Sequence, residues 1–246
     1  DEKLLFDCGP ATTWKLARGG IKTTEIDDVI VGNAFPEAET GFNMGRLLSL
    51  MSFDNVEVPG STVNRYCASG LETIAIASAK ITAGISDIIV AGGAETMSMI
   101  NMGGWRMVPN PDMAIKHPKW FLSMGLTSEM VAEEYKVTRK DQDKFALESV
   151  KKAIHAIDSG KFKEEIVPIN VKENYFEDGK NKTRDLVFDT DEGPRRGTTL
   201  EGLSKLKPAF SSNGFSTAGN SSQMSDGAAF VLVVSEKILK RYNLEP

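Results

Sequence analysis

The sequence is poor in cysteine and histidine. Its 246 residues include two cysteines, Cys8 and Cys67, and two histidines, His117 and His155. The cysteines show no CxxC spacing, so we expect neither a disulfide framework nor a zinc site, and a reducing compartment, the cytoplasm, is the natural setting. The expected cofactor is therefore not a metal, and any cysteine chemistry should involve a free thiol.

Long apolar runs and an excess of basic residues are also absent. No apolar segment approaches the ~20 residues that span a membrane, and we expect no secretory signal. A net charge of −5 argues against nonspecific nucleic-acid binding. With 41% apolar residues, the chain can bury a core as one large domain or two modest ones. Because it opens without methionine and stops soon after a helix-like segment, we expect a fragment of a longer protein.

Apolar periodicity predicts alternating strands and helices. The expected strands are residues 26–34, 61–66, 87–92 and 230–234, and the expected helices are 4–18, 42–52 and 68–83. Such alternation indicates a parallel α/β sheet with helices on both faces. The apolar face of the helix at 68–83 should consist of Leu71, Ile74, Ala75, Ser78 and Ile81, and Gly84 should end this helix.

Residues 97–224 interrupt this pattern and read as an insertion. Methionines crowd residues 97–130, which favours an irregular core over an adaptable surface for a hydrocarbon chain. Helices are expected at 127–136 and at 138–159, the second opened by a capping box of Thr138 and Asp141. A strand is expected at 165–171 in a charged, loop-rich stretch. The basic residues Arg195, Arg196, Lys205 and Lys207 are either a solvated face or an anion site.

Cys67 is the candidate nucleophile because it stands between a strand-like run and a helix-like segment. A thiol at the start of a helix meets the positive end of the helix dipole, which favours the thiolate. Free backbone N–H groups at the same place can hold a developing oxyanion. A thiolate attacks acyl carbons well and leaves readily from a thioester, so the pattern points to acyl transfer. A buried structural cysteine is the alternative.

A base for this nucleophile is not evident. His155 lies in an amphipathic helix flanked by lysines, and His117 lies in a proline-rich loop, so neither is expected to act on Cys67. Cys8 is expected to be a small packed residue. The sequence therefore predicts a nucleophile without its proton-transfer partners.

Motifs along the whole chain resemble those of the thiolase family. They lie at residues 63–71, 91–98, 124–130, 141–147, 217–220 and 226–228. The resemblance implies a layered α/β/α fold with a mixed sheet. Residues 1–96 and 225–246 would form an N-terminal half-domain, incomplete at its start. Residues 97–224 would form an inserted loop domain that binds CoA and the acyl group. The family's C-terminal half, which brings a histidine base and a second cysteine, is expected to be absent.

The resemblance also implies a reaction, in which Cys67 takes the acyl group of a 3-ketoacyl-CoA, releases acetyl-CoA and passes the acyl group to CoA, as in fatty acid β-oxidation. The backbone N–H of Cys67 would be one oxyanion donor. The implied substrate contacts are Arg195 at the nucleotide, Ala218 and Ser222 at the pantetheine arm, Met124 in the acyl pocket and Ser123 beside it. CoA is then a substrate, and no cofactor is expected.

Ser123 departs from the short-chain members of the family, which carry a histidine at this position. This favours a degradative 3-ketoacyl-CoA thiolase over an acetyl-CoA acetyltransferase, which is the alternative within the class. A non-catalytic CoA-binding fragment is the alternative from another class, and the chain alone is predicted to be inactive. The family also implies a homodimer or homotetramer.

Overall fold

The computed structural model describes residues 20–53 and 56–244, and the predicted helix at 4–18 with Cys8 lies outside these ranges. The chain divides into a first unit, residues 1–107 and 224–246, and a second unit, residues 108–223. The first boundary thus follows residue 107, beyond the predicted boundary after residue 96. Two backbone contacts account for the difference, because Ser98 N donates to Asp226 Oδ1 at 2.8 Å and Trp105 N donates to Glu37 Oε2 at 2.7 Å.

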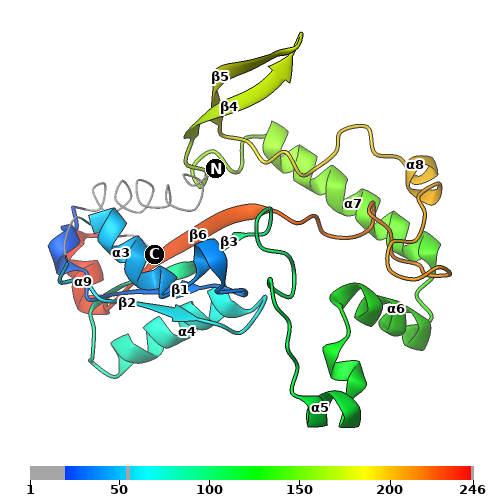
Figure 1. Ribbon diagram of the computed structural model, residues 1–246. Helices are drawn as coiled ribbons and strands as arrows, with labels where there is room; N and C mark the ends of the chain where they lie inside the picture. The colour runs from blue at the N-terminus through cyan, green and yellow to red at the C-terminus, as the bar shows by residue number, and fades with distance from the viewer. Residues whose placement is uncertain (1–19, 54–55, 245–246) are drawn as a thin grey trace. The chain divides into compact units, whose positions relative to one another are not determined.

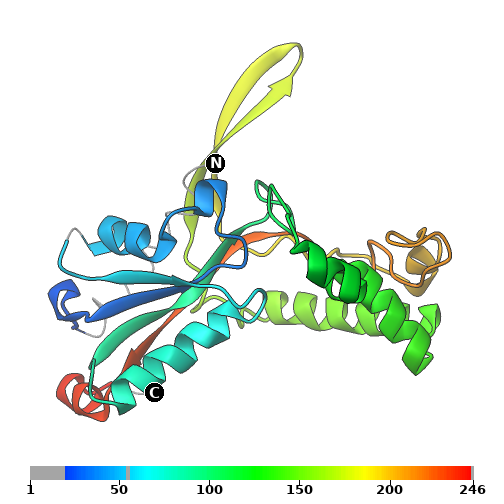
Figure 2. The same cartoon turned by 60° about the horizontal axis from the view of Figure 1, so that its bottom comes forward.

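The first unit is built on a four-stranded mixed sheet in the order β2–β1–β3–β6 (Figures 1 and 2). Its strands are β1 (Asp28–Gly32), β2 (Gly60–Val63), β3 (Ile88–Thr96) and β6 (Asp226–Val234). Strand β1 pairs in parallel with β2 and β3, whereas β6 pairs antiparallel with β3. The mixed sheet implied by the resemblance is confirmed. The all-parallel sheet expected from the alternation is wrong at β6, because this strand returns from the second unit without a crossover helix.

Helices cover both faces of this sheet, as the layered α/β/α prediction requires (Figure 1). One face carries α3 (Met44–Phe53) and α9 (Glu236–Tyr242), and the other carries α4 (Ser69–Thr82). The core under α3 and α9 includes Val29, Val31, Met44, Leu48, Ile88, Val90 and Ile238. The core under α4 consists of Ile30, Ala77, Ile89 and Ala91, with Ile74 and Ile81 packed against it. Burial of these apolar side chains fixes the layers on the sheet.

The buried face of α4 differs from the predicted one. Its buried residues are Ser69, Thr73 and Ala77, whereas Leu71 is 72% exposed and Ala75 and Ser78 are exposed as well. The expected face was therefore wrong in part, because the helix meets the sheet with small side chains that permit a close approach. Glycine on the sheet completes this contact. A Cβ on Gly32 would lie 2.5 Å from the carbonyl carbon of Ser69.

The second unit contains helices and a separate hairpin. Its elements are α5 (Pro111–Lys116), η3 (Pro118–Phe121), α6 (Met124–Tyr135), α7 (Arg139–Asp158), β4 (Ile169–Glu177), β5 (Lys180–Phe188) and α8 (Leu200–Ser204). The predicted helices at 127–136 and 138–159 are confirmed, with α6 beginning slightly earlier. The predicted capping box is present, since Asp141 N donates to Thr138 Oγ1 at 3.2 Å and Thr138 N donates to Asp141 Oδ2 at 3.1 Å.

The hairpin of β4 and β5 corrects the predicted strand at 165–171. The strand begins at Ile169 and continues to Glu177, and its partner β5 was not expected. Cross-strand polar pairs hold the two strands together, including an ion pair between Glu173 and Arg184 and a 2.7 Å hydrogen bond from Thr183 Oγ1 to Asn174 Oδ1. Because these pairs replace an apolar alternation, the sequence pattern resembled a charged loop. Within the described ranges, none of the helices is long and apolar enough to cross a membrane.

The contact between Gly32 and α4 gives the first testable prediction. Gly32→Ala should lower the free energy of unfolding by roughly 1–3 kcal/mol, because the added methyl group overlaps the backbone of Ser69 and Gly70. Urea unfolding followed by circular dichroism measures this loss. Gly70→Ala is the matched control. Its added Cβ meets nothing within 4 Å, and alanine in a helix should raise the stability by about 0.5–1 kcal/mol. Equal stabilities for the two variants would contradict the close approach.

Candidate active site

Cys67 lies at the predicted junction between a strand and a helix. Strand β2 ends at Val63, α4 begins at Ser69, and the exposed thiol stands immediately before Ala68, the N-cap residue of α4. The hydroxyl of Ser69 closes this turn. Its Oγ accepts a hydrogen bond from Arg65 N at 2.8 Å and donates one to Tyr66 O at 2.6 Å. The turn that carries the thiol is therefore bonded to the first residue of the helix.

The residue before the thiol has an unusual backbone. Tyr66 has φ 48°, in the left-handed region that non-glycine residues disfavour by about 1–3 kcal/mol. Its amide donates to Asn64 Oδ1 at 2.9 Å, and Ser69 N donates to its carbonyl oxygen at 3.0 Å. Hydrogen bonds on both sides of this peptide thus hold the strained conformation that presents Cys67.

Backbone amides near the thiol are only partly available to a ligand. The amides of Ala68 and Ser69 donate to Arg65 O and Tyr66 O, at 3.1 and 3.0 Å. They are therefore engaged within the turn. The amide of Cys67 itself donates to no carbonyl or side chain of the described residues. The amide of Cys67 is therefore an N–H group beside the sulfur that is not engaged within the turn, as an oxyanion donor must be.

An open hollow of the first unit surrounds the thiol. It is lined by Gly32, Tyr66, Cys67, Ser69, Gly70, Gly93, Ala94, Glu95, Gly227, Ala228 and Ala229. Small residues dominate this lining, so a flat group such as a thioester can approach the sulfur without displacing side chains. Glu95 is the carboxylic acid of the hollow. Burial raises the pKa of Glu95, while hydrogen bonds from Ala34 N, Phe35 N and Asn33 Nδ2 oppose that shift.

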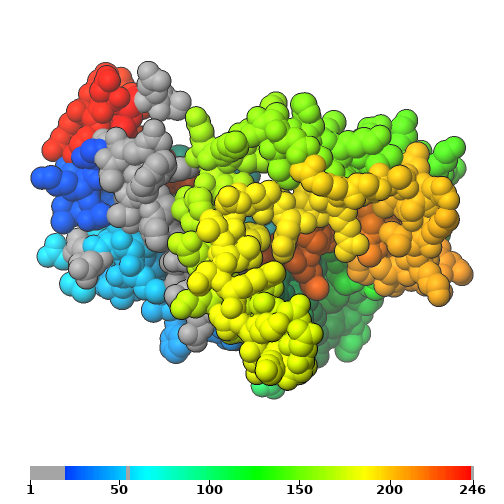
Figure 3. Space-filling view, turned by 90° about the horizontal axis from the view of Figure 1, so that it is seen from above, coloured from blue at the N-terminus to red at the C-terminus, as the bar shows by residue number. Residues whose placement is uncertain are grey.

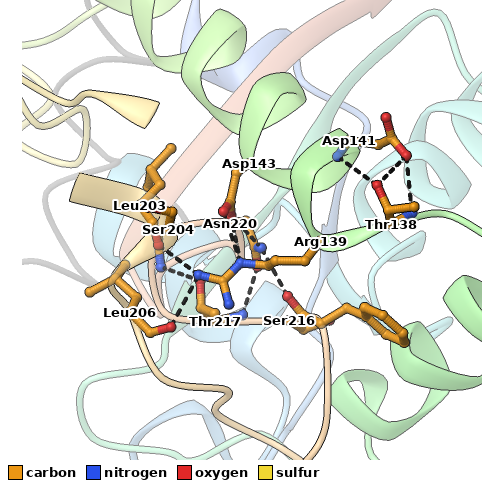
Figure 4. A network of polar contacts seen from close by, with 12 residues as sticks. Thr138, Arg139, Asp141, Asp143, Leu203, Ser204, Leu206, Ser216, Thr217 and Asn220 are labelled. Carbon is orange, nitrogen blue, oxygen red and sulfur yellow. Dashed lines mark hydrogen bonds and ion pairs between the residues drawn. The ribbon is translucent and has the colours of Figure 1, made fainter. Parts of the chain in front are cut away.

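Ala218, one of the predicted substrate contacts, lies on a loop of the second unit, residues 215–220, and Ser222 follows this loop. Asp143 of α7 is 3% exposed, and both of its oxygens accept from Arg139 Nε, at 3.0 and 2.9 Å (Figure 4). Asn220 Nδ2 donates to Asp143 Oδ1 at 2.9 Å, and Asn220 Oδ1 accepts from Thr217 N at 2.7 Å. A buried ion pair thus fixes the fold of this loop.

Helix α6 makes further contacts with loop 215–220, and the segment near α8 makes further contacts with Arg139. Glu129 of α6 accepts from Phe215 N at 2.7 Å and from Ser216 N at 2.9 Å. Arg139 Nη2 donates to Leu203 O at 2.6 Å, so the segment that follows β5 is bonded to the start of α7. That segment runs back alongside α7, as Figure 3 shows from above. Loop 215–220 is therefore held from two helices.

The predicted substrate contacts fall on and near this loop. Ala218 and Ser222 are exposed, and Met124, the first residue of α6, is 56% exposed. Ser123 caps α6 by accepting from Leu126 N at 3.4 Å. Arg195 is exposed and has no carboxylate partner among the described residues, whereas Arg196 is paired with Asp158. The second unit brings Ala218 and Ser222 together on one segment, while Cys67 belongs to the first unit.

Both histidines belong to the second unit. The ring of His117 stacks on Trp120, with centroids 4.0 Å apart and planes 8° from parallel, and His155 is exposed on α7. The first unit, in which Cys67 lies, contains neither of them. Among the residues that the structure describes, no group of three or more metal-ligating side chains is found.

Four polar residues of these sites were missed by the sequence reasoning: Glu95, Asn64, Asp143 and Asn220. Asp143 did carry a signal, because it lies four residues after Arg139 and four before the buried Leu147, on the inner face of α7. Glu95 is a carboxylate near the end of a buried apolar strand, where functional side chains of α/β sheets gather. Asn64 and Asn220 each join a local backbone amide to a partner distant in sequence, and the distant partner, Ala34 or Asp143, carried no signal.

Comparison with known proteins identifies relatives of the chain. Residues 10–237 match the family described as "Thiolase, N-terminal domain". The chain is 47% identical over 232 residues to the "3-ketoacyl-CoA thiolase" of Bacillus subtilis, covering 94% of this chain and 59% of that protein. It is 39% identical over 244 residues to the "Acetyl-CoA acetyltransferase" of Pseudomonas aeruginosa, covering 93% and 59%.

A solved structure agrees with these relatives. The crystal structure of the Bacillus anthracis acetyl-CoA acetyltransferase superposes with a TM-score of 0.81 at 35% identity, covering 98% of this chain and 62% of that one. The chain therefore spans about three fifths of the length of the proteins that it matches.

The buried pair of α7 gives the second testable prediction. Asp143→Ala should destabilise the second unit by roughly 2–4 kcal/mol, because it leaves the largely buried guanidinium of Arg139 and the amide of Asn220 without their acceptor. Asp158→Ala, on the same helix, removes an exposed ion pair with Arg196 and should change stability by less than about 1 kcal/mol. Thermal unfolding of both variants is the measurement. Equal losses of stability would contradict the role of the buried pair in holding loop 215–220.

Proposed function

The chain belongs to the thiolase family through its N-terminal domain, and from this premise we propose that it carries the nucleophile of a thiolytic acyl transfer. Cys67 at its strained turn is the observation that supports this proposal most directly, because a thiol held open at the start of a helix is suited to form a thioester. In the full-length protein the substrate would be a 3-ketoacyl-CoA.

The proposed reaction has two steps. The thiolate of Cys67 attacks the 3-keto carbon, the bond between C2 and C3 breaks, and the released acetyl-CoA carbanion takes up a proton. The acyl group then stays on the sulfur as a thioester. The deprotonated thiol of a second CoA attacks that thioester, the Cys67–acyl bond breaks, and a shortened acyl-CoA leaves. The amide of Cys67 would donate a hydrogen bond to the oxyanion in these steps.

We assign CoA to the exposed residues of the second unit. Arg195 would meet the nucleotide phosphates, Ala218 and Ser222 the pantetheine arm, and Met124 with Ser123 the acyl chain. Of the basic segment, Arg196 and Lys205 already pair with carboxylates, whereas Arg195 does not among the described residues. A guanidinium without a carboxylate partner is the better phosphate ligand.

We favour degradative cleavage within fatty acid β-oxidation over acetyl-CoA acetyltransferase activity. Ser123, where short-chain members carry a histidine, supports this choice, as does the 47% identity to a protein named 3-ketoacyl-CoA thiolase. The acetyltransferase alternative rests on the 39% identical relative and on the matching crystal structure. A cytoplasmic homodimer or homotetramer is part of the proposal.

Acylation of Cys67 is the third testable prediction. The chain alone should form a thioester with acetyl-CoA or a 3-ketoacyl-CoA in one slow round, because the nucleophile is present but neither histidine shares its unit. Intact-mass spectrometry after incubation should show one added acyl group, and peptide mapping should place it on Cys67. Cys67→Ser is the control and should stay unmodified. Sustained release of shortened acyl-CoA would contradict the expected lack of turnover and favour a complete active site.

CoA binding is the fourth testable prediction. Arg195→Ala should raise the Kd for CoA about tenfold, because a charge-assisted contact to phosphate is lost. Isothermal titration calorimetry at low salt measures the Kd of each protein for CoA. A higher salt concentration should reduce the difference in Kd between Arg195→Ala and the wild type. Arg196→Ala is the matched control, adjacent in sequence and paired with Asp158, and should change the Kd less than about twofold. Equal losses in both variants would indicate nonspecific charge attraction.

A further inference from the structure

We propose that Glu95 is a positioning residue for Cys67, acting through the backbone of Ala34 and the side chain of Asn64. The proposal rests on the nucleophilic role of Cys67 proposed above and deepens it. Glu95 belongs to β3 and lines the hollow of the thiol. The reaction steps written above give it no part, and its own contacts lead to the turn before the sulfur.

The carboxylate of Glu95 binds the segment that follows β1. Its Oε2 accepts from Ala34 N at 2.9 Å, and its Oε1 accepts from Asn33 Nδ2 at 2.7 Å and from Phe35 N at 3.4 Å. A carboxylate with two oxygens can accept all of these donors at once. The loop at residues 33–35 is therefore fixed from β3 by one side chain.

Asn33 allows this arrangement in one orientation only. Its side chain is fully buried, and its Nδ2 also donates to Ala94 O at 2.9 Å. Because a carbonyl oxygen can only accept, the amide nitrogen must face Ala94, and its second hydrogen then faces Glu95. Asn33 Oδ1 is left without a partner among the described residues. A buried unpaired acceptor is unfavourable, so the orientation is imposed by the pairing with Ala94 and Glu95.

The loop at 33–35 passes this constraint to the thiol. Asn64 Nδ2 donates to Ala34 O at 3.1 Å, and Asn64 Oδ1 accepts from Tyr66 N at 2.9 Å. Tyr66 is the left-handed residue directly before Cys67. A continuous series of hydrogen bonds thus runs from Glu95 to the peptide that carries the sulfur, and bonds arranged in series strengthen one another.

The presence of an ionisable carboxylate at Glu95 is not explained by a gain in folding stability. Desolvation raises its pKa above the ordinary value of 4.5 despite its donors. For an acid whose pKa is higher in the folded state, the folded state binds more protons, so stability decreases as pH rises from the unfolded pKa through the folded one. The ionised form therefore does not favour folding over that window. A role in holding the loop at 33–35 accounts for keeping a carboxylate there.

The experiment compares alkylation of Cys67 by iodoacetamide in the folded full chain and in Glu95→Gln, as second-order rates across a pH series. The glutamine keeps one acceptor oxygen, so its NH2 group must face either Ala34 N or the donors Asn33 Nδ2 and Phe35 N, and in both orientations part of the loop at 33–35 loses its acceptor. We expect labelling to slow about five- to tenfold at each pH of the series, because the turn no longer holds the thiol in its place at the start of the helix. Labelling at the wild-type rate throughout would overturn the proposal.

Asp27→Asn is the matched control. Asp27 also accepts two backbone amides of a neighbouring segment, those of Asp87 and Ile88 at 2.6 and 2.8 Å, but it precedes β1 and lies at its opposite end. Its loss should affect stability and leave the labelling rate of folded protein unchanged. Equal slowing in Asp27→Asn and Glu95→Gln would indicate general loosening and overturn the proposal.

Asn64→Ala tests the same series from its other end and serves if Glu95→Gln does not fold. It should slow labelling to a similar extent, and the double variant should be no slower than the slower single one, because both changes break one series. If the rate reductions of the two single variants multiply in the double variant, Glu95 and Asn64 act independently, and the proposal is overturned. Acylation by acyl-CoA is scored separately. Its absence in the wild type overturns the proposed function, whereas unchanged alkylation in the variants overturns only the role of Glu95.

Discussion

The close approach of α4 to the sheet is the constraint on which the thiol site depends. Ser69, the first residue of the helix, lies against Gly32, and Thr73 Oγ1 donates to Gly92 O at 3.2 Å. Small residues on both sides set this spacing, and interiors packed to such density leave no room for a shift. Because Ser69 also closes the turn around Tyr66, the position of Cys67 follows from the position of the helix.

The strained turn is held from two independent directions. Ser69 fixes it from the helix, and Asn64 fixes it from the loop that follows β1. A left-handed tyrosine persists only when its surroundings over-determine it, and these two anchors supply that condition. The strain is thus stored next to the sulfur, where it directs the side chain of Cys67 into the hollow rather than into the core.

Local patterns in the sequence predicted what depends on local physics. The buried strand at Val29–Val31, the capping box at Thr138 and the junction at Cys67 all follow from neighbouring residues, and the structure contains each of them. The inner face of α4 was predicted incorrectly because side-chain size, set by the distance to Gly32, outweighs hydrophobicity there. The hairpin was missed because its pairing uses charges across strands.

The two anchoring carboxylates could not be predicted from the sequence for a related reason. Glu95 and Asp143 bind loops more than sixty residues away in the chain, and nothing near them reveals those loops, although Arg139 marks Asp143 as an inner residue of α7. Their own sequence neighbourhoods predicted only a strand end and a helix face. A contact of this kind becomes visible when the fold brings the two segments together, whereas Cys67 is recognisable from the residues beside it.

In each unit a buried or half-buried carboxylate binds a loop: Glu95 binds the loop at 33–35, and Asp143 binds the loop at 215–220. A single physical reason explains both contacts. The residues that we propose to meet a ligand, such as Ala218 and the backbone of Cys67, have little apolar surface with which to bury themselves. Hydrophobic packing therefore cannot fix them. Hydrogen bonds to a carboxylate can, since they are directional and stronger than those between neutral groups. Buried ion pairs add little to stability compared with apolar packing. The placement of Asp143 and Glu95 is thus best explained by the loops that they orient.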